Sequence, residues 1–420
     1  PRRPPPPPRW PPRRSLHLFN VMLQPTGSEA LLIALQTPAP KGYTGIPVLV
    51  WGPPGVGKSS FLEALAAPNF PVLTLIASIH DPTDFSGLPV FHNGAVHYAV
   101  PEWVKQFETS GEGILFLDEL TTAPPAVQAA LLRVVLERKV GFHQLPPRVR
   151  IVAAANPPDL MTGGWDLSPP LRNRFVHLYW DLPVQAFLHA LENGYHSAQM
   201  PHIDAQQHAN LLPYWKLRTL AFLKTAPNLL RTNPEADQHA FASPRTWDFA
   251  TALMASCDVL GKAPKAGNKG DTVFYELLGG CLGNSVALPF IEFITKLRLP
   301  DPDTVLNGSI AVKVKDLNDS ELFVLFGSLN AAIERRYNQP NQLLPAAQYY
   351  LQLTQSVFDN NRRDVIYVSL KKALKNGLLL KIMESARKSG THTHQNLLQT
   401  IQTIFTDEGI KEFVDIFEKK

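Results

Sequence analysis

The chain has 420 residues, of which 45% are hydrophobic and 18% are charged. This length and composition are typical of a globular protein with a sizeable core and two or three domains. No stretch has the roughly 18 consecutive apolar residues that a membrane span needs, and the start lacks an apolar secretory leader, so we expect a cytoplasmic protein. Two cysteines are too few for a disulfide framework.

The first 14 residues, PRRPPPPPRWPPRR, contain five arginines and no acidic residue. A proline-rich tail of this kind is predicted to be extended or disordered. The net charge of the whole chain is +4, so the residues from Ser15 onward are close to neutral. A near-neutral body argues against a broad surface that grips the phosphates of DNA or RNA, and a nucleic-acid partner is therefore not our first expectation.

Short apolar runs alternate with helical patterns over residues 15–180, which indicates an α/β domain with a parallel sheet. The runs are continuous in their hydrophobicity, as expected for parallel strands that are buried on both faces. Five strands are predicted, in chain order, at 48–51, 71–77, 113–117, 149–155 and 175–180.

Strand signals end at Asp181, and the rest of the chain has helical periodicity. Residues 181–260 are predicted to form a helical lid on the α/β domain. The segment GKAPKAGNKGD at 261–271 has the composition of a linker and marks the predicted domain boundary. Residues 272–420 are predicted to form an additional all-α domain, whose pattern indicates no particular chemistry.

The segment GPPGVGKSS, which directly follows the first strand, matches the phosphate-loop pattern G-x-x-x-x-G-K-[ST]. Its glycines let the backbone curl so that N–H groups face an anion at the start of a helix. Lys58 is expected to bridge phosphate oxygens, and the Ser59 hydroxyl is expected to ligate Mg²⁺. The predicted nucleotide-binding residues are Gly52, Pro53, Pro54, Gly55, Val56, Gly57, Lys58, Ser59 and Ser60.

A second motif, ILFLDEL, ends the third predicted strand in two carboxylates. Carboxylates at the carboxyl edge of a strand beside a phosphate loop have two uses. Asp118 is expected to hold the hydrated Mg²⁺, and Glu119 is expected to polarise the attacking water. The sequence therefore predicts hydrolysis of a nucleoside triphosphate, with Mg²⁺ as a cofactor.

Further polar residues occur in a fixed order after these motifs. Asn156 follows the fourth strand, where a neutral amide suits the orientation of a water molecule. Arg172 and Arg174, in LRNRF, come just before the fifth strand, and Arg245, in SPR, begins a later helix. The planar guanidinium fork suits phosphate recognition, so all three arginines are candidate catalytic residues.

Taken in this order, the motifs resemble those of AAA+ ATPases, and most closely those of the MoxR family, over residues 15–260. The resemblance implies a P-loop AAA+ core with a helical lid, in which the bound nucleotide is ATP. It gives Asn156 the sensor-1 role and Arg245 the sensor-2 role. It also implies that one arginine of LRNRF is the finger that reaches the nucleotide of a neighbouring subunit. Arg174 is the first choice for that finger, and Arg172 remains open.

Two predicted hairpins support the same resemblance. LPVFHNGAVHYAV at 88–100 has Asn-Gly between two apolar runs, which is a strong hairpin signal. It resembles the hairpin that interrupts helix 2 in the clade of MoxR proteins, magnesium chelatases and dynein-like motors, where it projects toward the pore of a ring. RKVGFHQLPPRVRIVAAA at 138–155 predicts a second hairpin, similar to the insertion before sensor 1.

The resemblance implies a remodelling ATPase or chaperone that forms a homo-oligomeric ring, expected to be a hexamer. Its partner would be a client or adaptor protein, for example one with a von Willebrand A-like domain. Two alternatives remain open. One is an AAA+ nucleic-acid motor, and the other is a monomeric P-loop kinase or switch, which would have no use for an arginine acting between subunits.

Overall fold

The structure is a computed structural model, and it describes residues 27–157, 164–193, 198–233, 239–264, 270–297, 299–389 and 401. Its contacts divide the chain into two compact units. The first unit comprises residues 1–205, 231–263 and 271–288, and the second comprises 206–230, 264–270 and 289–420. The predicted tail at 1–14 lies outside the described residues.

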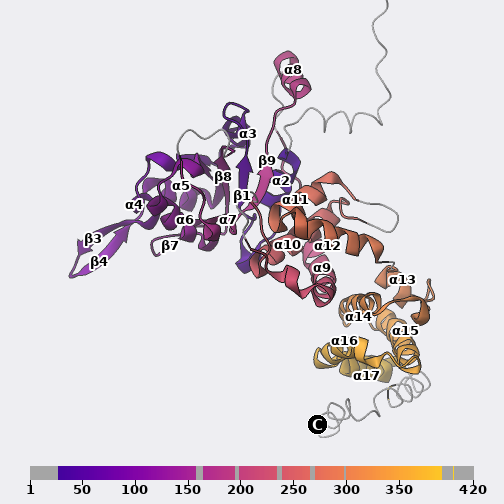
Figure 1. Cartoon of the computed structure of the whole chain (residues 1–420). Helices are drawn as coiled ribbons and strands as arrows, with labels where there is room; N and C mark the ends of the chain where they lie inside the picture. Colours follow the sequence, from indigo (N-terminus) through magenta and orange to yellow (C-terminus); the bar gives the residue numbers. More distant parts are fainter. Residues whose placement is uncertain are drawn as a thin grey trace, which may run out of the picture. The chain divides into compact units, whose positions relative to one another are not determined.

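The first unit is built on a five-stranded parallel sheet with the strand order β2-β5-β8-β1-β9. Figure 1 labels β8, β1 and β9 of this sheet. All five predicted strands and their parallel pairing are confirmed, with ends that differ by at most one residue. The strands are β1 (Val48–Trp51), β2 (Val72–Ile76), β5 (Glu112–Asp118), β8 (Arg148–Ala155) and β9 (Val176–Tyr179).

Helices cover both faces of this sheet, because successive side chains of a strand point to opposite faces. Leu49, Leu117 and Ile151 share one face and pack in a core with α5 and α6. On the other side, α2 contacts β1, α11 contacts β9, and α10 contacts both of these helices. The helices of this unit are α2 (Ser28–Gln36), α3 (Lys58–Glu63), α4 (Thr83–Ser86), α5 (Glu102–Ser110), α6 (Pro125–Glu137), α7 (Pro169–Arg172), α8 (Val184–Asn193), α10 (Pro244–Val259) and α11 (Thr272–Leu282), with single 3-10 turns η2 (Pro40–Gly42), η3 (Ala77–Ile79) and η4 (Leu120–Thr122).

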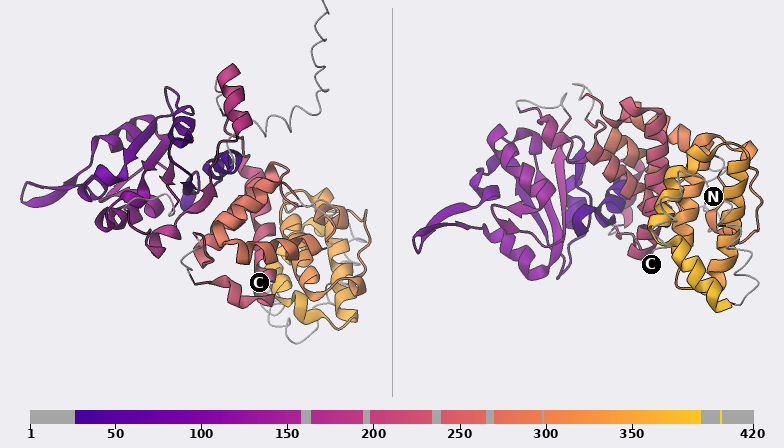
Figure 2. Two further views of the ribbon diagram at one scale, coloured as in Figure 1. Left: turned by 45° about the horizontal axis from the view of Figure 1, so that its top comes forward. Right: turned by 90° about the horizontal axis from the view of Figure 1, so that it is seen from below.

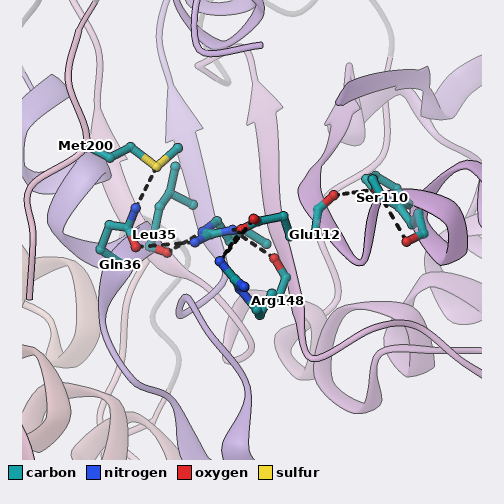
Figure 3. Close-up of polar contacts among 8 residues, drawn as sticks. Leu35, Gln36, Ser110, Glu112, Arg148 and Met200 are labelled. Atoms are coloured by element: carbon teal, nitrogen blue, oxygen red, sulfur yellow. Dashed lines mark hydrogen bonds and ion pairs between the residues drawn. The ribbon is translucent and has the colours of Figure 1, made fainter. Parts of the chain in front are cut away.

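A buried arginine, Arg150 of β8, ties the amino end of the sheet to α2. Its guanidinium donates to the carbonyls of Leu35 and Arg148 at 2.9 and 2.8 Å, and it lies 3.5 Å from the carboxylate of Glu112. Glu112 also pairs with the exposed Arg148 at 2.9 Å, and Gln36 extends the cluster toward Met200 (Figure 3). The network therefore joins α2, β5 and β8 through one buried cation.

Both predicted hairpins are present in the first unit. The first consists of β3 (Leu88–His92) and β4 (Ala95–Ala99), and the turn residues Asn93 and Gly94 both have positive φ, as the tight turn requires. It extends away from the sheet (Figure 1), and every residue of its two strands is exposed. The second consists of β6 (Lys139–Val140) and β7 (His143–Gln144).

The second unit consists of helices around a core of its own. This core gathers apolar side chains from α13, α14, α15, α16 and α17, such as Leu325, Phe326 and Leu351. The helices assigned wholly or mainly to this unit are α9 (Ala205–Thr225), η6 (Pro227–Leu230), α12 (Asn284–Lys296), α13 (Pro302–Leu306), η7 (Val314–Asp316), α14 (Asp319–Glu334), α15 (Pro340–Asp359), α16 (Arg363–Lys375) and α17 (Leu378–Ser389). Figure 2 draws both units from two further directions.

The compact units divide the chain at places other than the predicted domain boundaries. The helix α11, predicted to begin the C-terminal domain, packs on β9, where a Cβ on Gly280 would lie 2.3 Å from the carbonyl oxygen of His177. At the predicted linker 261–271, Lys262 pairs with Glu29 at 2.6 Å and with Asp271 at 3.1 Å. Both ends of that segment are thus tied to the first unit, while α9, from the predicted lid, groups with the second.

Candidate active site

The phosphate loop lies between β1 and α3, where the pattern placed it. Gly55 and Gly57 both have φ of 79°, in the left-handed region that favours glycine. Gly52 is required for a different reason, since a Cβ there would lie 2.5 Å from the carbonyl oxygen of Trp180. The loop therefore combines two positions that need glycine for conformation with one that needs it for space.

Lys58 begins α3, and its ammonium group lies over the loop. It donates to the carbonyls of Gly52 and Pro53 at 2.5 and 2.9 Å. Burial lowers the pKa of Lys58, and the nearby Asp118 carboxylate partly opposes that shift. The ammonium group is thus confined to the space above the loop, which is where the phosphates of a nucleotide would lie.

Asp118 ends β5 beside the phosphate loop, and the hydroxyl of Ser59 donates to its carboxylate at 3.1 Å. These are the two residues predicted to hold Mg²⁺, and both offer oxygen atoms at one point. Mg²⁺ is commonly bound by one or two protein oxygens together with water and substrate phosphates. The pair therefore fits such an ion, although a set of three histidine, cysteine or acidic side chains able to hold a metal is absent from the described residues.

Glu119 follows Asp118 in a left-handed conformation with φ of 54°. Its side chain is exposed and accepts a hydrogen bond from the hydroxyl of Ser78 at 3.1 Å. Ser78 lies in η3 just after β2, and β2 pairs with β5 so that Ile76 is opposite Asp118. The sequence analysis did not identify Ser78, although a polar residue just past a strand end was an available signal.

Asn156 directly follows β8 at the same edge of the sheet. The N–H of Gly52 donates to the carbonyl of Ala155 at 3.2 Å, which places the residue before Asn156 against the start of the phosphate loop. The carboxyl ends of β1, β5 and β8 thus bring together Lys58, Ser59, Asp118, Glu119 and Asn156, as expected for parallel strands.

The arginines predicted to be catalytic occupy another part of the first unit. Arg174 and Arg245 both line a cavity of about 960 Å³. Pro47, which precedes β1, also lines it, so the cavity is at the amino edge of the sheet. Because five residues of strand span about 16 Å, this edge is well separated from Gly52 at the start of the phosphate loop.

We call this cavity, lined by Arg174 and Arg245, the arginine pocket, and Asn173 forms hydrogen bonds across it. Its carboxamide oxygen accepts from the Ser243 hydroxyl at 2.8 Å and from Arg245 at 3.1 Å. Arg174 donates to the carbonyl of Pro170 at 2.6 Å. Five lining residues are basic, namely Lys41, Arg138, Arg174, Arg231 and Arg245, whereas Asp248 is the single acidic residue among those that line the cavity. Burial lowers the pKa values of Arg174 and Arg245, and the two guanidinium groups face one pocket that favours an anion.

Arg172 is placed differently from Arg174. It is not among the residues that line the arginine pocket, and its guanidinium carbon lies 5.9 Å from the ring centre of Phe241. Its carbonyl contacts Nε2 of His177 at 2.9 Å, and Nδ1 of that histidine accepts from the indole of Trp51. Burial lowers the pKa of His177 to about 3, so this ring is neutral and links Arg172 to the end of β1.

Comparisons with known proteins agree with this geometry. Residues 47–175, less than a third of the chain, match the family model for the AAA domain (dynein-related subfamily). This segment contains β1, the phosphate loop, Asp118, Glu119, Asn156, Arg172 and Arg174. Residues 47–175 are therefore similar to an AAA domain, which agrees with the coarser part of the resemblance that the motifs predicted.

Two curated relatives are bacterial regulators. The chain is 33% identical over 138 residues to the Nif-specific regulatory protein of Rhizobium etli, matching 31% of this chain and 24% of that protein. It is 39% identical over 119 residues to the Psp operon transcriptional activator of Escherichia coli, matching 26% of this chain and 37% of that protein. The chain thus spans well under half the length of the curated relatives that it matches.

Among solved structures, the crystal structure of a Cytophaga hutchinsonii protein assigned as an ATPase is similar over 68% of this chain and 95% of that chain. The two are 15% identical with a TM-score of 0.41, below the level that establishes a shared fold. Within the part of the chain that the structure describes, every helix is too short or too polar to cross a membrane.

Proposed function

We propose that this chain, with an AAA domain at residues 47–175, is an Mg·ATP-hydrolysing remodelling ATPase of MoxR type. In this proposal it works as a ring of identical copies, expected to be a hexamer, on a partner protein. Family resemblance suggests a partner or adaptor with a von Willebrand A-like domain. The exposed hairpin of β3 and β4 offers such a partner an apolar surface. It contains no Asp, Glu, Lys or Arg residue, and Phe91 in it is 75% exposed.

The chemistry assigned to the site follows from its two carboxylates. Ser59 and Asp118 would hold Mg²⁺, which when bound neutralises charge on the β- and γ-phosphates. Lys58 would bind the same phosphates, and Glu119 would take up the proton of the attacking water. Asn156 would orient that water beside Glu119.

The proposal of a ring rests on the distance between two groups of site residues. The groups that would bind phosphate, metal and water lie at the carboxyl edge of the sheet, whereas Arg174 and Arg245 lie in the arginine pocket at the amino edge. The strand between the two edges covers about 16 Å over five residues, so we infer that these arginines act on the nucleotide of another copy. A head-to-tail neighbour would present its arginine pocket to the nucleotide, and such heterologous contacts form a ring when the rotation between neighbours closes.

Mixing two inactive variants tests this arrangement. We expect Lys58→Ala and Arg174→Ala each to lose ATP turnover. In an equimolar mixture, contacts form in which the Arg174→Ala copy supplies its intact phosphate loop and the Lys58→Ala copy supplies its intact arginine. Random assembly makes about a quarter of the contacts competent, so turnover should return to about that fraction. The same experiment applies to Arg245→Ala.

The controls separate the possible outcomes. Arg148→Ala removes an exposed arginine that does not line the pocket and should keep full turnover, because Arg148 is 63% exposed and pairs with Glu112 at the surface. Arg172→Ala, mixed in the same way, compares the two candidate fingers. An inactive mixture would contradict action between copies, and full turnover by Arg174→Ala alone would favour a monomeric kinase or switch.

A nucleic-acid motor is the second candidate. It is favoured by the names of the matched relatives, one of which is a transcriptional activator. The nearly neutral charge of the chain after residue 14 counts against it. Measuring ATP turnover with and without duplex and single-stranded DNA decides between the two, since a motor is stimulated by its track and a protein remodeller is not.

A further inference from the structure

Trp180 lies directly after β9 and beside the phosphate loop. Its backbone N–H donates to the carbonyl of Trp51 at 2.7 Å and thereby extends the pairing of β1 and β9 by one residue. Its own carbonyl is the group that leaves no room for a Cβ on Gly52. Trp180 is 2% exposed, so the first residue of the loop is fixed against a buried backbone.

The side chain of Trp180 contacts the loop again further along. The indole N–H donates to the carbonyl of Val56 at 3.2 Å. The ring also meets the ring of Phe61, on α3, edge to face with 4.8 Å between the centroids. One side chain therefore contacts the middle of the phosphate loop and the helix that follows it.

The bond to Val56 has a consequence for the next residue. The carbonyl of Val56 and the N–H of Gly57 belong to one planar trans peptide, so they point in opposite directions. Gly57 has φ of 79°, and because glycine adopts positive and negative φ with similar ease, the residue itself does little to fix the orientation of this peptide. A donor that holds the carbonyl on the Trp180 side turns the N–H of Gly57 toward the other side. In phosphate loops, backbone N–H groups are the donors that surround the anion.

From these contacts we infer that Trp180 is a positioning residue for nucleotide binding, which acts by holding the Val56–Gly57 peptide in the orientation that presents an N–H to phosphate. The inference rests on the proposed binding of ATP at this loop. It concerns the affinity for nucleotide rather than the hydrolytic step, because within the described part of the chain Trp180 makes no hydrogen bond to Asp118, Glu119 or Asn156.

Two replacements of Trp180 test the role of the indole N–H. Trp180→Phe keeps an aromatic ring against Phe61 but removes the donor. Incorporation of 3-benzothienylalanine at position 180 keeps the full bicyclic shape and replaces the N–H with sulfur. With Mg·ATP as the probe, we expect both variants to raise the KM about five- to tenfold, the usual effect of one lost hydrogen bond, and to leave kcat within about twofold.

Trp103→Phe is the matched control. Trp103 is also buried, at 8% exposed, but its indole nitrogen has no hydrogen-bond partner within the described part of the chain. The control should therefore keep the wild-type KM. A wild-type KM in the benzothienylalanine variant would overturn the inference. This holds even if Trp180→Phe raised the KM, because the rise would then result from altered packing and not from the lost hydrogen bond. A five- to tenfold fall in kcat with an unchanged KM in the two Trp180 variants would also overturn the inference. Failure of the wild-type chain to bind ATP would reject the proposed function and this inference together.

Discussion

At the scale of single residues, the side chain of Glu119 needs a hydrogen-bond partner to fix its orientation. Glu119 is exposed and has a left-handed backbone, so its side chain would sample many orientations without a partner. The hydroxyl of Ser78 supplies that partner at 3.1 Å, from the end of the neighbouring strand. The orientation of the carboxylate that is proposed to activate water thus depends on a residue 41 positions earlier in the chain.

We expect Ser78→Ala to lower kcat for ATP hydrolysis about three- to tenfold while the KM for ATP stays within twofold, because the change affects the base and not the phosphate contacts. Steady-state kinetics on the purified chain measures both constants. Ser110→Ala is the control, since Ser110 lies at the opposite end of β5 and bonds to the carbonyl of Glu112. A kcat equal to that of the wild type would show that Ser78 does not orient Glu119.

At the scale of elements, Arg150 decides how α2 is attached to the sheet. Its side chain is 4% exposed, and it bonds to a carbonyl at the end of α2, to a carbonyl of its own strand and to Glu112 (Figure 3). Arg148 pairs with the same carboxylate but is 63% exposed. The two arginines therefore share a partner and differ in burial, which makes them a matched pair.

Replacing the buried Arg150 should lower the free energy of unfolding much more than replacing the exposed Arg148. We expect Arg150→Met to lower the free energy of unfolding by about 3 kcal/mol, because it leaves carbonyls and part of a carboxylate without a donor. Arg148→Met should lower it by less than about 1 kcal/mol, as is usual for exposed ion pairs. Urea unfolding followed by tryptophan fluorescence compares the two. Equal midpoints for both variants would contradict the role assigned to Arg150.

At the scale of the whole molecule, the two compact units have separate cores, and the proposed catalytic residues all belong to the first. Within that unit the residues for phosphate and metal are separated from the arginine pocket by the length of the strands. In the proposed ring, one copy would supply two half-sites of different kinds. Assembly, rather than a change within one chain, is then the step that would complete the proposed catalytic site.

We expect the variant Glu119→Gln to form a ring, most simply a hexamer, when Mg·ATP is added, because it should bind ATP without consuming it. Mass photometry with and without Mg·ATP measures the assembly directly. Lys58→Ala is the control and should not respond to nucleotide, since it lacks the ammonium group that lies over the phosphate loop. A monomer under both conditions would contradict the ring proposal.

The sequence by itself determined the features that depend on neighbouring residues. Continuous apolar runs predicted all five strands of the sheet, and the spacing of glycine, lysine and serine predicted the phosphate loop. Asp118 and Ser59 were predicted to meet at one metal site, and they lie 3.1 Å apart, because parallel strands bring their carboxyl ends to one edge.

The tertiary structure decided the features that depend on distant segments. Only the fold places Ser78 and Trp180 on the active-site loops, because each contact joins different strands of the sheet. Only the fold shows that Arg174 and Arg245 share a pocket at the other edge, and that α11 packs on β9 across the predicted linker. Local patterns fix secondary structure, whereas these placements result from long-range packing, which no short window of sequence contains.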